Sequence, residues 1–174
     1  MLIRSGFTTR PEKQMADEVE IPNIGALLGP LLSKLDSSLL PTLLAGLERG
    51  AAGRYRSWAA NCDDPDETRG LLACAGREDE IADRVERLFP LDDAARADAD
   101  AEKPLPEARR LYLTVFDPHP QRAQYRIQAS AEREGAAAWR GIGAAHPSAA
   151  TREELEAIAG LEEENAAFLE SLFV

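Results

Sequence analysis

The sequence has little cysteine, few aromatic residues, no excess of positive charge and no long apolar run. Two cysteines in 174 residues, Cys62 and Cys74, are too few for a disulfide framework and indicate reduced thiols. Lys and Arg total 20 against 31 Asp and Glu, and the net charge of -11 argues against binding to nucleic acid. No stretch approaches the roughly 18 consecutive apolar residues of a membrane span. We therefore expect a cytoplasmic protein that contacts neither membrane nor nucleic acid.

The composition predicts a fold built from helices. Aromatic residues make up only 6% of the chain, and strand-like alternation of apolar and polar residues is rare. Ala, Leu, Glu and Arg dominate instead, as they do in packed helices. The length fits one domain with a sizeable core. The sequence therefore predicts a single all-α domain.

Proline, glycine and helix-capping residues divide the chain into segments. The expected elements are, in order, an N-terminal arm over 1–20, a domain over 21–174 that contains a short or broken helix over 24–35, a helical hairpin over 38–89, an acidic linker over 91–104, and a second hairpin over 121–173. Residues 106–116 fit either a short helix or an extended crossover. The segment over 21–35, the N-terminal apolar segment, is apolar on more sides than one surface helix needs. We therefore expect it to cover one bundle end or to join two chains as a homodimer.

The two predicted hairpins resemble each other in sequence. Shifting the chain by 84 residues aligns 47–90 with 131–174 without a gap, and 15 of the 44 positions are identical. Composition alone would give about a tenth. The repeat predicts a duplicated two-helix unit in which each hairpin buries the apolar face of the other.

Each of the four predicted long helices has an apolar stripe at spacing three and four, with one glutamate in its middle. These glutamates are Glu48, Glu78, Glu132 and Glu162. A single such glutamate is often a boundary residue whose carboxylate reaches water. Four at equivalent repeat positions favour convergence inside the bundle, and no Lys, Arg or His on the stripes would compensate their charge. Buried carboxylates without a cation take up protons or bind a metal.

Each hairpin resembles the two-helix unit of the ferritin-like superfamily, most closely the rubrerythrin-type domain. In that family a glutamate precedes an aromatic residue by seven positions, as Glu48 precedes Tyr55 and Glu132 precedes Trp139. The second helix carries Glu-x-x-His followed by alanine, and Glu78 and Glu162 match its glutamate. The resemblance implies a ferritin-like four-helix bundle with a long crossover and four glutamate ligands for two metals. It also implies that Tyr55 and Trp139 contact these ligands without binding the metals themselves.

The two histidines of the family pattern are replaced, by Ile81 and Asn165. Carboxylates without imidazole suit hard cations such as Mn, Mg or Ca better than iron. We therefore expect a degenerate dimetal site with a non-catalytic binding or structural role. The alternative is a carboxylate-rich dimetal oxidoreductase of iron or manganese that acts on peroxide, oxygen or ferrous iron.

Overall fold

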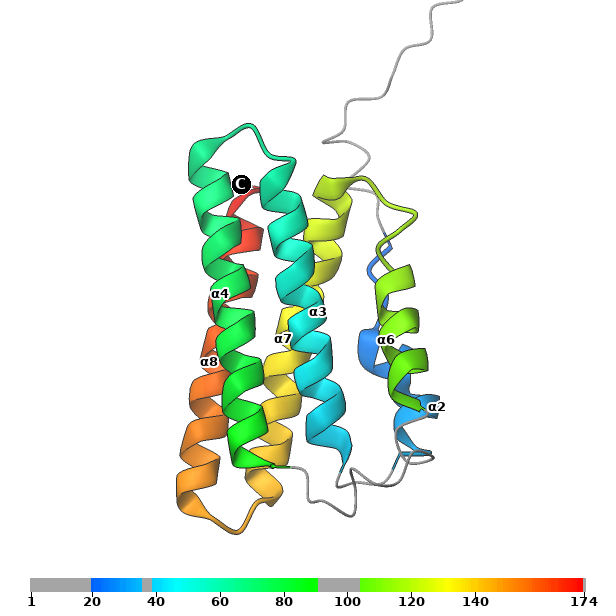
Figure 1. Cartoon of the computed structure of the whole chain (residues 1–174), viewed down its shortest axis with the longest axis vertical. Coiled ribbons are helices and arrows are strands. Elements are labelled where there is room, and N and C mark those ends of the chain that lie inside the picture. Colours follow the sequence, from blue (N-terminus) through cyan, green and yellow to red (C-terminus); the bar gives the residue numbers. More distant parts are fainter. Residues whose placement is uncertain (1–19, 36–38, 91–103, 174) are drawn as a thin grey trace, which may run out of the picture.

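The computed structural model describes residues 20–35, 39–90 and 104–173, and in these residues it is helical, with no strand (Figure 1). The all-α prediction is thereby confirmed. The helices are α2 (Ile24–Leu32), α3 (Leu40–Ala60), α4 (Pro65–Leu88), α6 (Pro104–Thr114), α7 (Gln121–Ala145) and α8 (Ala149–Ser171).

The four long helices form two antiparallel pairs, α3 with α4 and α7 with α8 (Figure 1). Local sequence explains where the second helix of each pair begins. The side chain of Asp64 accepts hydrogen bonds from the first backbone N–H groups of α4, and Pro65 occupies a first-turn position where no N–H is needed. Ser148 caps α8 in the same way, through the N–H of Thr151. The predicted helix limits therefore agree with the structure within about two residues.

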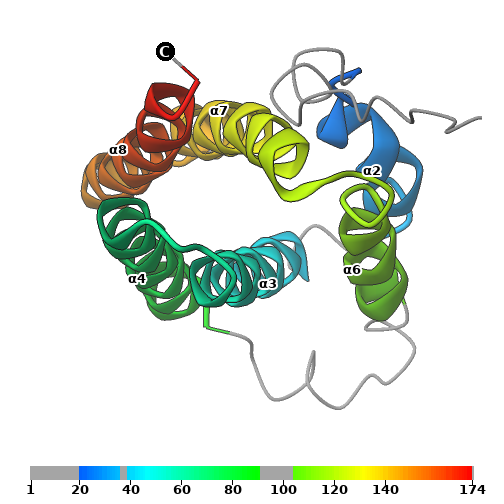
Figure 2. The same ribbon diagram turned by 90° about the horizontal axis from the view of Figure 1, so that it is seen from above.

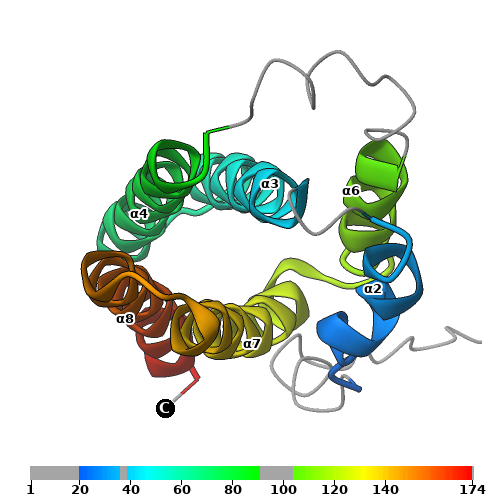
Figure 3. The same ribbon diagram turned by 90° about the horizontal axis from the view of Figure 1, so that it is seen from below.

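The pairs meet where α4 packs against α8, and the opposite side, between α3 and α7, is flanked by α6 and α2 (Figures 2 and 3). Helix α6 contacts α3, while α2 contacts both α6 and α7. The sequence left a short helix and an extended crossover open for residues 106–116. In the structure these residues are mainly helical. Helix α6 begins at Pro104, so the acidic linker ends one residue earlier than predicted.

The N-terminus of α2 is bound by a carboxylate of α7. Glu134 accepts hydrogen bonds from the backbone N–H groups of Ile24, at 3.3 Å, and Gly25, at 2.8 Å. A negative charge at this end is favourable because the first N–H groups of a helix lack helical partners. Helix α2 thus packs on α6 and α7, beside the long helices, and does not cover a bundle end, which was one of its two expected positions. Its role in a homodimer stays a prediction.

The predicted N-terminal arm lies, except for Glu20, outside the described residues, as does the acidic linker up to residue 103. Among the helices described, none combines the length and the apolar character that a membrane crossing requires.

The core follows the predicted stripes. Large side chains on the stripes of the long helices, such as those of Tyr55, Leu71, Trp139 and Leu155, are at most 1% exposed. Burial of these side chains is the main favourable contribution to folding. Leu44 and Ile142, which belong to the predicted stripes, are only half-buried.

Two glycines of α4 provide a test of this packing. A Cβ atom on Gly70 would lie 2.1 Å from the ring of Phe168, whereas one on Gly76 would meet nothing within 4 Å. We expect Gly70→Ala to lower the free energy of unfolding by about 1–3 kcal/mol, because the ring must move. The matched control Gly76→Ala should raise it by up to about 1 kcal/mol through helix propensity. Urea unfolding followed by circular dichroism measures both, and equal effects would contradict the packing described.

Candidate metal centre

Three of the four predicted glutamates converge among the long helices. Glu48 on α3, Glu78 on α4 and Glu162 on α8 each offer a carboxylate oxygen, and these oxygens lie within 4.8 Å of one another. Glu78 and Glu162 are 0% and 1% exposed, and Glu48 is half-buried. We call these three residues the carboxylate cluster.

The fourth glutamate, Glu132 on α7, is also buried but lies outside this group of three. Its Oε1 accepts two hydrogen bonds, one from the Tyr55 hydroxyl and one from the Gln128 amide, both at 2.7 Å. It also contacts the cluster, because its charge and a hydrogen bond with it raise the pKa of Glu78 and of Glu162, and its charge raises the pKa of Glu48. Glu132 therefore touches Glu78 and Glu162 and, in addition, has hydrogen-bond donors of its own.

Two of the cluster's oxygens accept hydrogen bonds and one has none. The indole of Trp139 donates to Oε1 of Glu162 at 3.0 Å, and the amide of Asn165 donates to Oε1 of Glu78 at 2.6 Å. Oε2 of Glu78 is buried without a hydrogen-bond partner. Leaving a buried carboxylate oxygen unpaired is costly. This atom therefore marks the place where a proton or a cation would be bound most favourably.

A glycine on α7 makes room for the cluster. A Cβ atom on Gly135 would lie 2.8 Å from Oε1 of Glu162, closer than ordinary side-chain contacts. Shifting the sequence by 84 residues places Ala51 of α3 at the equivalent position. The missing methyl group thus lets the carboxylate of Glu162 lie directly against the backbone of α7.

The residues at the two family histidine positions are fully buried, but they differ in what they contact. Ile81 belongs to an apolar cluster with Ala82 and Val85 and offers no ligand atom. Asn165 directs its amide nitrogen at Glu78, while its Oδ1 accepts a hydrogen bond of 2.6 Å from Nε of Arg77. The amide oxygen, which is the only atom of Asn165 that could bind a metal, thus faces an arginine.

The apolar stripes carry no Lys, Arg or His, yet two arginines beside them reach the glutamates through amides. Arg77 reaches Glu78 through Asn165. Arg54 donates to Oε1 of Gln128 at 2.6 Å, and Gln128 in turn donates to Glu132. Sequence reasoning missed these residues because the arginines lie beside the stripes rather than on them. The repeat holds a usable signal, because positions 54, 77, 128 and 165 are polar while their partners Ala138, Leu161, Leu44 and Ile81 are apolar.

Burial and like charge shift the cluster toward its protonated form. Burial raises the pKa of Glu48 to about 8, with a further contribution from the charge of Glu132 and an opposing one from contacts with Glu78 and Glu162. Burial, and then the charges of Glu132 and Glu48, hold the pKa of Glu78 well above its ordinary value. Burial, the charge of Glu48 and a hydrogen bond with Glu132 do the same for Glu162. Without a cation, the cluster therefore keeps protons at neutral pH.

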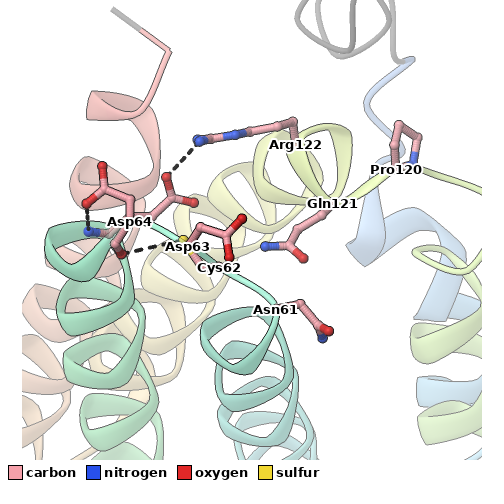
Figure 4. A pocket seen from close by; sticks show the side chains of 8 residues that line it. Asn61, Cys62, Asp63, Asp64, Pro120, Gln121 and Arg122 are labelled. Atoms are coloured by element: carbon pink, nitrogen blue, oxygen red, sulfur yellow. Dashed lines mark hydrogen bonds and ion pairs between the residues drawn. The ribbon is translucent and has the colours of Figure 1, made fainter.

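A second polar region lies where the α3–α4 turn faces the beginning of α7 (Figure 4). A cavity of about 420 Å³ is lined there by Asn61, Cys62, Asp63, Asp64, Glu67, Pro120, Gln121 and Arg122. Its buried carboxylate, Glu67, already accepts hydrogen bonds from Arg122 at 2.7 Å and from the Tyr125 hydroxyl at 2.9 Å. The carboxylate cluster, which holds an unpaired buried oxygen, is the stronger candidate site.

Comparison of the chain with models of known protein families, with curated proteins and with solved structures gives no match.

The pKa shifts predict how stability depends on pH. The folded protein holds protons on the cluster that the unfolded chain releases above about pH 4.5, so the free energy of unfolding should fall as the pH rises from about 5 toward 9. Glu78→Gln removes one of these groups and should make the fall shallower. Chemical unfolding in the presence of a chelator at several pH values measures the slope. Glu153→Gln, an exposed position on α8, should leave the slope unchanged, and equal slopes in all three proteins would contradict the assignment.

Proposed function

We propose that this chain binds a divalent cation inside a ferritin-like four-helix bundle and has a binding or structural role. The observation that carries the proposal is the unpaired, buried Oε2 of Glu78, which belongs to a group of three carboxylates from three helices. In a low-dielectric interior, three such carboxylates repel one another unless protons or a cation neutralise them. A divalent cation compensates two charges at once.

Duplication of a two-helix unit is supported by ion pairs at equivalent places. Arg49 on α3 forms an ion pair of 2.9 Å with Glu86 on α4. The residues 84 positions later, Arg133 on α7 and Glu170 on α8, form an ion pair of 2.7 Å. A second ion pair repeats in the same way, Arg56 with Asp79 and Arg140 with Glu163. The first residues of α4 and α8, Pro65 and Ala149, are also 84 positions apart. Surface ion pairs add little stability, so their repetition is better explained by common descent of the hairpins.

The donor atoms fit a hard cation and do not fit the complete ligand set of the family. Ile81 offers no ligand atom, and the oxygen of Asn165 faces Arg77. What is left is carboxylate oxygen, which suits Mn²⁺, Mg²⁺ or Ca²⁺ better than a metal that needs imidazole. A bound cation would supply charge neutralisation and a link between α3, α4 and α8.

The first test is stabilisation by the ion alone. Because the cluster exists only in the folded chain, Mn²⁺ at about 100 times its dissociation constant should add about 2.7 kcal/mol to the free energy of unfolding. Glu162→Gln should abolish this gain, whereas Glu153→Gln on the same helix should keep it. Thermal unfolding with and without Mn²⁺ at pH 8 measures the difference. A gain that persists in Glu162→Gln would show that the ion binds elsewhere.

A redox enzyme is the second candidate, and the Tyr55–Glu132 contact favours it. The phenol of Tyr55 lies 2.7 Å from a carboxylate oxygen next to the cluster, where it could support a redox-active metal. Iron bound in stoichiometric amounts, with the visible absorption of the ferric ion, would favour this candidate over the structural role. Protein without iron that still gains stability from Mn²⁺ would favour the structural role.

The family resemblance gives a prediction of its own. The double change Ile81→His and Asn165→His should restore the family's ligand pattern and raise the affinity for ferrous iron by at least about tenfold. Both positions are fully buried, so retention of the fold is checked by circular dichroism before anaerobic iron titration. A folded double variant that binds iron no better than the parent would mean that these positions do not face the site.

A further inference from the structure

Asn165 faces the carboxylate cluster with the nitrogen of its amide, and an arginine fixes that orientation. Nε of Arg77 lies 2.6 Å from one amide atom of Asn165, and Oε1 of Glu78 lies 2.6 Å from the other. A guanidinium only donates hydrogen bonds, so the atom beside Arg77 is the amide oxygen. The amide N–H group, whose hydrogens carry partial positive charge and repel a cation, is thereby turned toward Glu78.

Arg77 is itself held by two further contacts. Its Nη2 donates to Sγ of Cys74 at 3.4 Å, and its Nη1 lies 3.7 Å from a carboxylate oxygen of Glu164. Cys74 is fully buried, whereas Glu164 is exposed. Exchange of the oxygen and nitrogen of the Asn165 amide would leave the oxygen without this charged donor, at a cost that is larger than for a neutral hydrogen bond.

The repeat shows how the same two helices pack without this polar pair. Arg77 is on α4 and Asn165 is on α8, and the shift of 84 residues pairs them with Leu161 on α8 and Ile81 on α4. Ile81 is fully buried in an apolar cluster, and Leu161 packs against that cluster. An apolar pair therefore fills the equivalent place, and packing of α4 against α8 does not by itself require an arginine and an amide.

A turned amide would change the ligands that a cation finds at the cluster. The oxygen of Asn165 would then take the place of the nitrogen, which lies 2.6 Å from Oε1 of Glu78. Around an octahedral ion with oxygen ligands at about 2.1 Å, neighbouring ligands are about 3 Å apart. The turned amide would therefore bring a neutral oxygen beside Glu78 at nearly the spacing of a second ligand. Arg77 prevents this.

We propose that Arg77 determines which cations the cluster prefers, by holding the amide of Asn165 with its oxygen turned away from the site. This inference rests on the proposed function and makes it more specific. Asn165 is then a positioning residue that donates to Oε1 of Glu78 and leaves the unpaired Oε2 to the ion. Ca²⁺ takes about six to eight oxygen ligands, whereas Mg²⁺ and Mn²⁺ are satisfied by an octahedron, so withholding an amide oxygen disfavours Ca²⁺ most.

Isothermal titration of the full chain with Ca²⁺ and with Mn²⁺ tests the inference. In Arg77→Leu the amide is free to turn, so the affinity for Ca²⁺ should rise by about tenfold, the size of effect that groups beside metal ligands have. The affinity for Mn²⁺ should rise by a smaller factor. Arg77→Lys keeps both the charge and a donor for the amide oxygen, and it should keep the preference of the parent chain.

The apolar pair of the repeat supplies the control for charge. In an Asn165→Ile background there is no amide to turn, so Arg77→Leu should change the affinities for Ca²⁺ and Mn²⁺ by the same factor, through loss of one positive charge. This double-mutant cycle isolates the part of the effect that passes through the amide. Circular dichroism checks the fold of each variant, and Arg77→Met, which keeps more of the side-chain volume, replaces Arg77→Leu if that variant does not fold.

The outcomes separate this inference from the proposed function. Affinities for Ca²⁺ and Mn²⁺ that change by equal factors in Arg77→Leu would overturn the role of Arg77 in selectivity and leave cation binding intact. A preferential gain for Ca²⁺ that persists in the Asn165→Ile background would overturn it as well, because the amide would not be its cause. No binding of either ion to the parent chain would overturn the proposed function itself, and this inference with it.

Discussion

Mutual repulsion among carboxylates buried between four helices is the constraint on which the centre of this molecule depends. Glu48, Glu78 and Glu162 come from three different helices, and packing of those helices brings their oxygens within 4.8 Å. The apolar stripes that drive the packing also force the like charges together. The polar groups around the cluster reduce the free-energy cost of burying these carboxylates close together.

Two arginines lie near the glutamates without being fully buried themselves. The guanidinium of Arg77 touches the cluster only through the Asn165 amide, and Arg54 reaches Glu132 only through Gln128. A guanidinium placed directly in the interior would lose its own hydration. An amide can link the two groups, because its oxygen accepts a hydrogen bond from the arginine while its nitrogen donates one to the carboxylate. Both arginines are half-buried: Arg77 also lies 3.7 Å from the exposed Glu164, whereas Nη2 of Arg54 is buried without a hydrogen-bond partner.

Much of this arrangement could be predicted from sequence, because it follows from periodicity and capping. The long helices and the inward position of the glutamates needed only the stripe pattern and residues such as Asp64 and Ser148. The different hydrogen-bond partners of Glu132 and Glu48 could not be predicted, since they depend on side-chain torsions and on contacts between helices. The packing of α2 on α7 was missed for a similar reason. It depends on a contact between Glu134 and two backbone N–H groups more than 100 residues away.

Comparison of the two repeats separates what packing requires from what the site requires. A core needs only apolar side chains of suitable volume, and well-packed apolar residues in place of buried charges are often neutral or stabilising. The repeats have nevertheless kept glutamate at both pairs of positions, 48 with 132 and 78 with 162, while their surroundings have diverged. Leu44 stands opposite Gln128, and Ile81 opposite Asn165. Glutamate at all four positions, beside core positions that differ between the repeats, therefore supports the proposed cation site rather than a role in packing alone.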